Sequence, residues 1–177
     1  MHCLSRIILN GRICQQKYSQ MDHFRTSLTY REALVKATEI CSKAEKCSFD
    51  VELKCREWQL SDVETSRLIE YLQQEKFIDE QRYANSFVND KFRFNKWGRI
   101  KLAYSLRMKQ VEENCIRQAL ANLPQQAYQE VLLDLLSAKA KSLGAEEAYT
   151  RKGKLLAFAQ GRGFEVDLAV KLLERIK

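Results

Sequence analysis

The chain has 177 residues, with 30 Lys and Arg against 23 Asp and Glu, so its formal net charge is +7. A hydrophobic content of 45%, with 30% charged residues and a single proline, is typical of a globular chain and leaves little room for low-complexity disorder. The longest apolar run, residues 155–159, is far shorter than the roughly 20 residues of a membrane span. We therefore expect no transmembrane helix and no membrane partner.

The first 29 residues differ in composition from the rest of the chain. They are polar, carry four basic residues against one acidic residue and lack a helical period, which predicts a flexible basic arm over residues 1–29. Met21 is an alternative start, in which case the residues before it are not translated. The apolar run at 7–9 is shorter than the roughly 7 residues of a minimal signal core, so we expect a cytoplasmic protein.

The six cysteines do not form a metal or disulfide pattern. No two are spaced as Cys-x-x-Cys, and only His2 and His23 are available to complete a metal site. We expect free thiols, several of them small core residues, and no cofactor.

From Tyr30 onward the apolar residues recur at helical spacing and hardly ever alternate with period two, so an all-α fold is predicted. The pattern is interrupted at 44–48, 59–61, 77–79, 95–98, 109–112, 123–125, 143–150 and 160–165, which predicts nine helices. Ser48, Ser61 and Asp79 are expected to cap the helices that follow them. Pro124 either stops one helix or opens the next.

The nine predicted helices repeat as three units of three. A shift of 51 residues aligns Val51 with Leu102, and a shift of 53 aligns Leu102 with Leu155; the turn residues Leu60, Val111 and Phe164 coincide as well. We therefore predict three tandem three-helix modules: module 1 at 30–78, module 2 at 79–125 and module 3 at 126–177. Stacked end to end, they would form an elongated, curved body with a long exposed flank.

No arrangement of residues predicts catalysis. The histidines lie in the expected arm, no phosphate-binding glycine loop is present, and Gly161-Arg162-Gly163 is interpreted as a turn between helices. We expect a protein that is not an enzyme.

Two basic clusters are the candidate functional features. Residues 91–111 contain seven basic residues and no acidic one, and the part of module 3 between Ala148 and Phe164 contains four more, again without an acid.

Uncompensated cations repel one another, so a partner with negative potential is favoured over a merely solvated basic face. Basic groups neutralise phosphates and aromatic rings stack on bases, as nucleic-acid grooves require, although a tryptophan placed like Trp97 at a helix junction is more often a packing residue between modules. The candidate binding residues are Lys91, Arg93, Lys96, Trp97, Arg99, Lys101, Arg107, Lys109, Arg151, Lys152, Lys154 and Arg162. Because Lys152 aligns with Arg99, the two clusters are expected on one flank.

The run from Lys76 to Lys101 resembles the RecX family of recombination regulators. The matching elements are Ile78-Asp79-Glu80, then Arg82-Tyr83-Ala84, and later Gly98-Arg99 before a helix. The resemblance extends from about Tyr30 to the C-terminus. Family members usually carry glycine at the turn between the second and third helices of a module, whereas this chain has Gln59, Gln110 and, only in module 3, Gly163.

The resemblance implies a helical-repeat protein that binds the RecA filament on single-stranded DNA and limits strand exchange and ATP hydrolysis. Nothing in the sequence indicates an obligate dimer, so we expect a monomer. Direct DNA binding would be weak. Two alternatives stay open: a helical DNA-binding protein that acts without RecA, such as a transcription regulator, and an interaction scaffold for an acidic protein.

Overall fold

The computed structural model describes residues 27–144 and 147–176, which form nine α-helices and no strand. In chain order these are α2 (Tyr30–Lys43), α3 (Ser48–Glu57), α4 (Asp62–Gln74), α5 (Glu80–Asn95), α6 (Arg99–Met108), α7 (Glu113–Ala121), α8 (Gln125–Ser142), α9 (Ala148–Arg162) and α10 (Val166–Leu173). The all-α prediction is confirmed for this part of the chain. Most of the predicted N-terminal arm lies outside the described residues; at its end, the Leu28 N–H donates to the Trp58 carbonyl at 3.1 Å.

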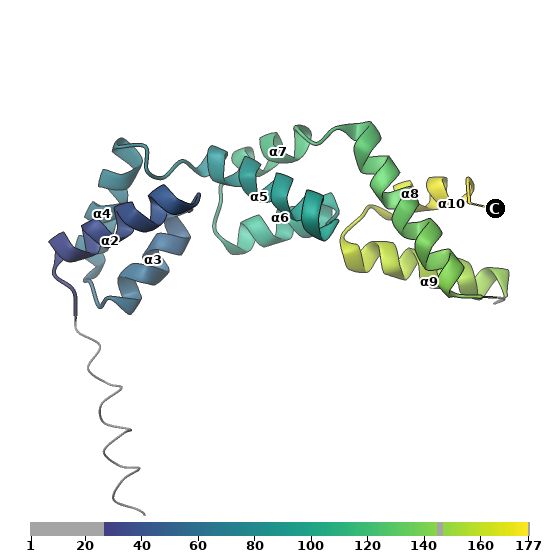
Figure 1. Cartoon of the computed structure of the whole chain (residues 1–177), viewed down its shortest axis with the longest axis horizontal. Helices are drawn as coiled ribbons and strands as arrows, with labels where there is room; N and C mark the ends of the chain where they lie inside the picture. Colours follow the sequence, from purple (N-terminus) through teal and green to yellow (C-terminus); the bar gives the residue numbers. More distant parts are fainter. Residues whose placement is uncertain (1–26, 145–146, 177) are drawn as a thin grey trace, which may run out of the picture.

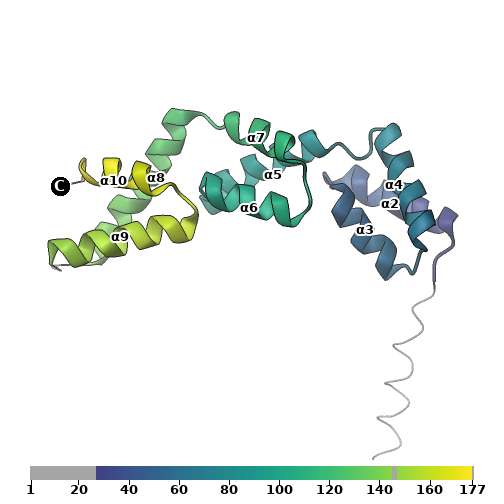
Figure 2. The same cartoon turned by 180° about the vertical axis from the view of Figure 1, so that it is seen from behind.

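The helices follow one another as three groups in an elongated body (Figure 1). Helices α2–α4 belong to module 1, α5–α7 to module 2 and α8–α10 to module 3. The second helix of each module, α3, α6 or α9, lies along the same long edge of the body in both views (Figures 1 and 2). This edge carries most of the candidate binding residues.

Local capping explains several helix starts. Ser61 forms a capping box with Glu64 at the start of α4, and the Asp79 carboxylate accepts the Arg82 N–H at 2.9 Å at the start of α5, as predicted. The prediction for Ser48 is wrong, because α3 begins at Ser48 and its N-cap residue makes no side-chain capping bond. Instead, the Ser48 N–H donates to Glu80 Oε1 of α5 at 2.7 Å, so the next module satisfies this amide.

Helix α9 is longer at both ends than the sequence predicts. It begins at Ala148, inside the predicted break at 143–150, and continues through Gly161 to Arg162. Of the predicted turn Gly161-Arg162-Gly163, only Gly163 lies outside the helix, and its backbone adopts φ 84°. A helical Gly161 is tolerated because a single exposed glycine costs a helix only about 1 kcal/mol.

The turns between second and third helices adopt the left-handed conformation in all three modules. Gln59 has φ 61°, Gln110 φ 57° and Gly163 φ 84°. The two glutamines therefore occupy positions that favour glycine, at a cost of roughly 1 kcal/mol each.

Within residues 27–144 and 147–176, the buried apolar side chains form two cores. One core comprises buried residues of α2–α4 with Ile78, and the aligned position Val51 lies in it. The other runs continuously through α5–α10, includes Leu102 and Leu155, and also takes in Cys47 from module 1. Modules 2 and 3 thus share one core, whereas module 1 packs mainly on itself.

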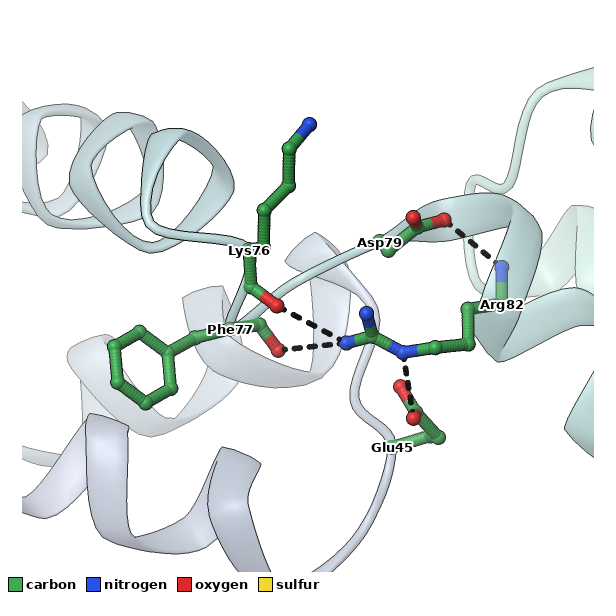
Figure 3. Close-up of polar contacts among 5 residues, drawn as sticks. All are labelled: Glu45, Lys76, Phe77, Asp79 and Arg82. Atoms are coloured by element: carbon green, nitrogen blue, oxygen red, sulfur yellow. Dashed lines mark hydrogen bonds and ion pairs between the residues drawn. The ribbon is translucent and has the colours of Figure 1, made fainter.

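The junction between modules 1 and 2 is largely polar. Arg82 of α5 donates from Nε to Glu45 Oε1 at 2.6 Å and from Nη2 to the carbonyl oxygens of Lys76 and Phe77 at 3.2 and 3.4 Å (Figure 3). A second ion pair joins Lys109 Nζ to Asp50 at 2.5 Å. Arg82 of module 2 therefore holds both the α2–α3 loop and the C-terminal end of module 1.

Candidate nucleic-acid interface

The junction between modules 2 and 3 is built around the fully buried Tyr128 of α8. Its hydroxyl accepts the Arg99 N–H at 2.9 Å and donates to Glu165 Oε2 at 2.7 Å. Burial raises the pKa of this phenol, so the hydroxyl stays protonated and able to donate. Phe92 and Phe164 pack on its ring, with centroids at 5.7 and 5.0 Å.

Arg99, a predicted binding residue, is held in this junction. Its guanidinium lies over the Tyr128 ring, with Cζ 4.1 Å from the centroid. Nη2 donates to Gln125 at 2.9 Å, and Nη1 lies 3.8 Å from Glu165. These contacts assign Arg99 to the packing of modules 2 and 3.

A close approach of two backbone turns brings part of the second basic cluster to the first. The Gly98 N–H donates to the Arg162 carbonyl at 2.9 Å, and the Ile100 N–H donates to the Gly163 carbonyl at 3.0 Å. A Cβ on Gly98 would lie 2.2 Å from the Gly163 carbonyl oxygen, so this approach requires glycine. The Arg162 side chain then reaches the Asn95 carbonyl, with Nη1 at 3.1 Å.

Five predicted residues gather at the α5–α6 turn, and we call them the Trp97 cluster. Two ammonium groups approach the Trp97 ring: Nζ of Lys91 is 5.6 Å and Nζ of Lys101 is 4.6 Å from its centroid. Lys96 lies in the turn itself, and Arg162 reaches it from α9. Trp97 also packs against the shared core and edge-on against Phe87, so its packing role is present. The members are Lys91, Lys96, Trp97, Lys101 and Arg162.

The expectation of seven uncompensated cations in 91–111 is wrong for three of them. Arg107 pairs with Glu113 at 2.7 Å, Lys109 with Asp50 at 2.5 Å and Arg99 with Glu165 at 3.8 Å. The Arg107 guanidinium lowers the pKa of Glu113, which keeps that pair charged. Charge counting along the chain missed these pairs because Asp50 and Glu165 lie far away in sequence and Glu113 lies just past the counted stretch.

Four cations of the stretch have no carboxylate partner among the described residues. Three belong to the Trp97 cluster: Lys91, Lys96 and Lys101. The fourth, Arg93, is exposed in the last turn of α5, with Cζ 5.6 Å from the centroid of the Phe94 ring. The local surplus of positive charge is therefore concentrated at the end of α5 and the start of α6.

The rest of the module 3 cluster lies at the other end of α9. Eleven residues separate Arg151 from Arg162, which places them about 16 Å apart along the helix. Arg151 is half-buried and donates to the Ala140 carbonyl at 3.4 Å, whereas Lys152 and Lys154 are exposed. Arg162 thus joins the first cluster, whereas Arg151, Lys152 and Lys154 form a separate patch at the start of α9.

The second helices differ sharply in charge. Helix α3 carries two basic and three acidic residues, whereas α6 and α9 together carry seven basic residues and no acidic one. The edge formed by α6 and α9 is therefore suited to a long polyanion or to the acidic surface of a protein.

Two features of this region were missed from the sequence. Tyr128 and Glu165 are 37 residues apart, and nothing in a single sequence links them. The exposed apolar row Ile100, Tyr104 and Met108 was visible as an i, i+4, i+8 pattern within a helix.

No helix in the described ranges has the length and apolar character to cross a bilayer. Within the same residues, no group of three or more His, Cys, Asp and Glu side chains is arranged to hold a metal ion.

Comparison with known proteins decides the family. The family model described as RecX, second three-helix domain, matches residues 79–120. The regulatory protein RecX of Clostridium acetobutylicum is 24% identical over 98% of this chain and 84% of its own length, and that of Clostridium botulinum is 31% identical over 78% and 64%. The crystal structure of RecX from Lactobacillus salivarius superposes with a TM-score of 0.76 at 18% identity, covering 83% of this chain and 96% of its own.

The chain is a member of the RecX family. The structure gives physical roles to the residues that carry the resemblance. Arg82 of the Arg82-Tyr83-Ala84 motif joins module 1 to module 2, and Gly98 of the Gly98-Arg99 motif lets module 2 touch module 3. These RecX motif residues hold modules together rather than line a catalytic site.

Proposed function

We propose that this RecX-family chain acts in the cytoplasm as a non-enzymatic regulator of homologous recombination and DNA repair. It binds the RecA filament on single-stranded DNA and inhibits strand exchange and ATP hydrolysis. The observation that carries the proposal is the basic edge formed by α6 and α9, two helices without an acidic residue along an elongated body, with the Trp97 cluster at the start of α6. A filament is long and coated in phosphate and protein charge, so an elongated basic edge suits it better than a compact pocket would.

Within this proposal the candidate residues divide by role. The Trp97 cluster and Arg93 face the filament, because four of these cations lack carboxylate partners among the described residues. Lys152, with its neighbours Arg151 and Lys154, forms the second patch about 16 Å further along α9. Arg99, Arg107 and Lys109 position the modules, because each is held by a carboxylate.

The test is RecA ATPase activity on single-stranded DNA with increasing amounts of the protein. We expect inhibition at ratios below one molecule per RecA protomer. The double variant Lys91→Gln, Lys101→Gln removes two charges beside Trp97 and should weaken inhibition at least about threefold, in keeping with the loss of two phosphate-type contacts.

A matched control removes the same charge elsewhere: Lys36→Gln with Lys171→Gln, both exposed in α2 and α10. The control should inhibit like the wild type. Wild-type protein that leaves ATPase activity unchanged would reject the proposed function, and equal inhibition by both double variants would reject the role of the Trp97 cluster.

A second candidate is a DNA-binding protein that acts without RecA. It is favoured by one observation, the tryptophan flanked by two ammonium groups, since that arrangement offers both stacking and phosphate contacts. This candidate requires tight binding to naked DNA, with log K falling by about 0.7 to 0.9 for each phosphate contact per unit of log salt.

A further inference from the structure

Helix α6 presents a row of exposed apolar side chains that the fold does not use. Ile100, Tyr104 and Met108 are 56%, 62% and 59% exposed, while Leu102 and Leu106 on the opposite face are fully buried. The spacing i, i+4, i+8 aligns the row along about 12 Å of helix. Elsewhere in the described chain no helix has three large apolar side chains exposed to this degree.

The row is not a general property of the repeat. The aligned positions in α9 are small, and those in α3 end in a charge: Gly153, Ala157 and Gly161 in the first case, Phe49, Leu53 and Glu57 in the second. Module packing therefore does not account for the row, because modules 1 and 3 fold without it. A contact made by module 2 alone does account for it.

Cationic residues border the row. Helix α6 contains no acidic residue, and its helical positions place Lys101 on one side of the row and Arg107 on the other. Lys101 is itself a member of the Trp97 cluster, so the row and the cluster adjoin. Arg107 is ion-paired with Glu113, so the positive charge beside the row lies on the Lys101 side. A complementary partner is therefore apolar opposite the row and acidic opposite Lys101.

We propose that the α6 row docks an acidic protein surface that has exposed apolar residues, and that the RecA protomer supplies this surface; the inference rests on the proposed function and deepens it. A nucleic acid suits the row less well, because only Tyr104 has a π-face to stack on a base, whereas Ile100 and Met108 on either side of it have none and phosphates offer no apolar surface to bury. Helix α6 then contacts protein, while the adjoining Trp97 cluster contacts DNA. One interface is divided between two kinds of partner.

The test uses the full chain with Ile100→Gln, Tyr104→Gln and Met108→Gln combined. Glutamine keeps the helix and the net charge and removes only apolar surface. The matched control is Val35→Gln, Val63→Gln and Tyr71→Gln, which removes exposed apolar groups from module 1. Both proteins are checked for unchanged helicity by circular dichroism, and binding is measured by fluorescence anisotropy to RecA without DNA and, separately, to single-stranded DNA without RecA.

We expect the α6 variant to bind RecA at least about tenfold more weakly than the wild type, in keeping with central apolar residues of an interface. Its DNA affinity should stay within about twofold of the wild type, with an unchanged salt slope because no charge is removed. The control should match the wild type in both assays.

The other outcomes each overturn the inference in a distinguishable way. If the α6 variant loses affinity for naked single-stranded DNA as well as for RecA, the row contacts nucleic acid. If the α6 variant binds both RecA and DNA like the wild type, the row contacts neither partner. If the wild type itself does not bind DNA-free RecA, the inference is rejected, whereas the proposed function is rejected only if the wild type also leaves the RecA ATPase on single-stranded DNA unchanged. If the wild type binds and the α6 variant binds equally, only the inference is rejected.

Discussion

The contact between Gly98 and Gly163 predicts a large effect from a single methyl group. In a Gly98→Ala variant, the new Cβ would lie 2.2 Å from the Gly163 carbonyl oxygen and 2.4 Å from the Phe164 nitrogen. An ordinary contact needs about 3.5 Å, so the two turns must separate by roughly 1 Å. The obstacle is backbone on both sides, so no side-chain rotation relieves it.

The expected loss of stability can be worked from this separation. Two interturn hydrogen bonds, Gly98 N–H to Arg162 and Ile100 N–H to Gly163, break at about 1 kcal/mol each. Overpacking adds about 1–3 kcal/mol, so the free energy of unfolding should fall by about 3–5 kcal/mol. Urea unfolding followed by far-UV circular dichroism measures this change.

Gly153→Ala is the matched control, because it makes the same chemical change in an exposed part of α9 where nothing lies within 4 Å of the new Cβ. Alanine in a helix is favoured over glycine by about 1 kcal/mol, so this variant should be slightly more stable than the wild type. A Gly98→Ala protein as stable as the Gly153→Ala control would show that the two turns do not touch as described.

Three further predictions concern single residues. Gln110→Gly should raise the free energy of unfolding by about 0.5–1 kcal/mol in urea titrations, because it relieves a left-handed non-glycine residue; a loss of stability would contradict the turn geometry. Tyr128→Phe should lower it by about 1–3 kcal/mol, because the half-buried Arg99 N–H loses its acceptor; a neutral result in the same titration would contradict that bond. Burial raises the pKa of Cys47 to about 11, so only the unfolded chain ionises this thiol between about pH 8.5 and pH 11, and stability should fall as pH rises through that window. In a Cys47→Ala variant, the free energy of unfolding should fall less steeply with pH over the same window, as measured by urea titrations at several pH values. An equally steep fall in the variant and the wild type would show that Cys47 does not contribute.

Helical periodicity predicted the repeated core positions correctly. Val51, Leu102 and Leu155 align by a simple shift, and all three are buried at the same place in their modules. This succeeds because a helix that packs on one face must repeat apolar residues near every 3.6 positions. The nine helices of the described residues followed from the same rule, since each predicted interruption contains a boundary between two helices, although α9 extends into the interruptions on both of its sides.

The way modules join was not predictable from one sequence. Lys109 pairs with Asp50, 59 residues away, and the Arg99 N–H bonds to Tyr128, 29 residues away. No local pattern encodes such pairs, because they depend on how modules stack. As a result, counting charges along 91–111 overstated the free positive charge, while the cations beside Trp97 remain predicted binding residues.

The ends of α9 show a further limit of local patterns. Glycine is usually a turn residue, so Gly161 was placed in a break, yet the helix continues for one more residue after it. The chain turns at Gly163, where the backbone must become left-handed and a neighbouring module leaves no space for a side chain. Local composition does not separate these two glycines, whereas their surroundings do.

The measurement that tests the central claim most directly compares binding to the RecA filament with binding to naked single-stranded DNA at two salt concentrations. The account predicts that at about 0.15 M salt the filament is bound at least about tenfold more tightly, because protein and phosphate contacts are made together. It also predicts that the filament keeps this advantage at the higher salt concentration, since the apolar contacts of the α6 row are not screened by salt. Equal or tighter binding to naked DNA would contradict the account and favour a DNA-binding protein that acts without RecA.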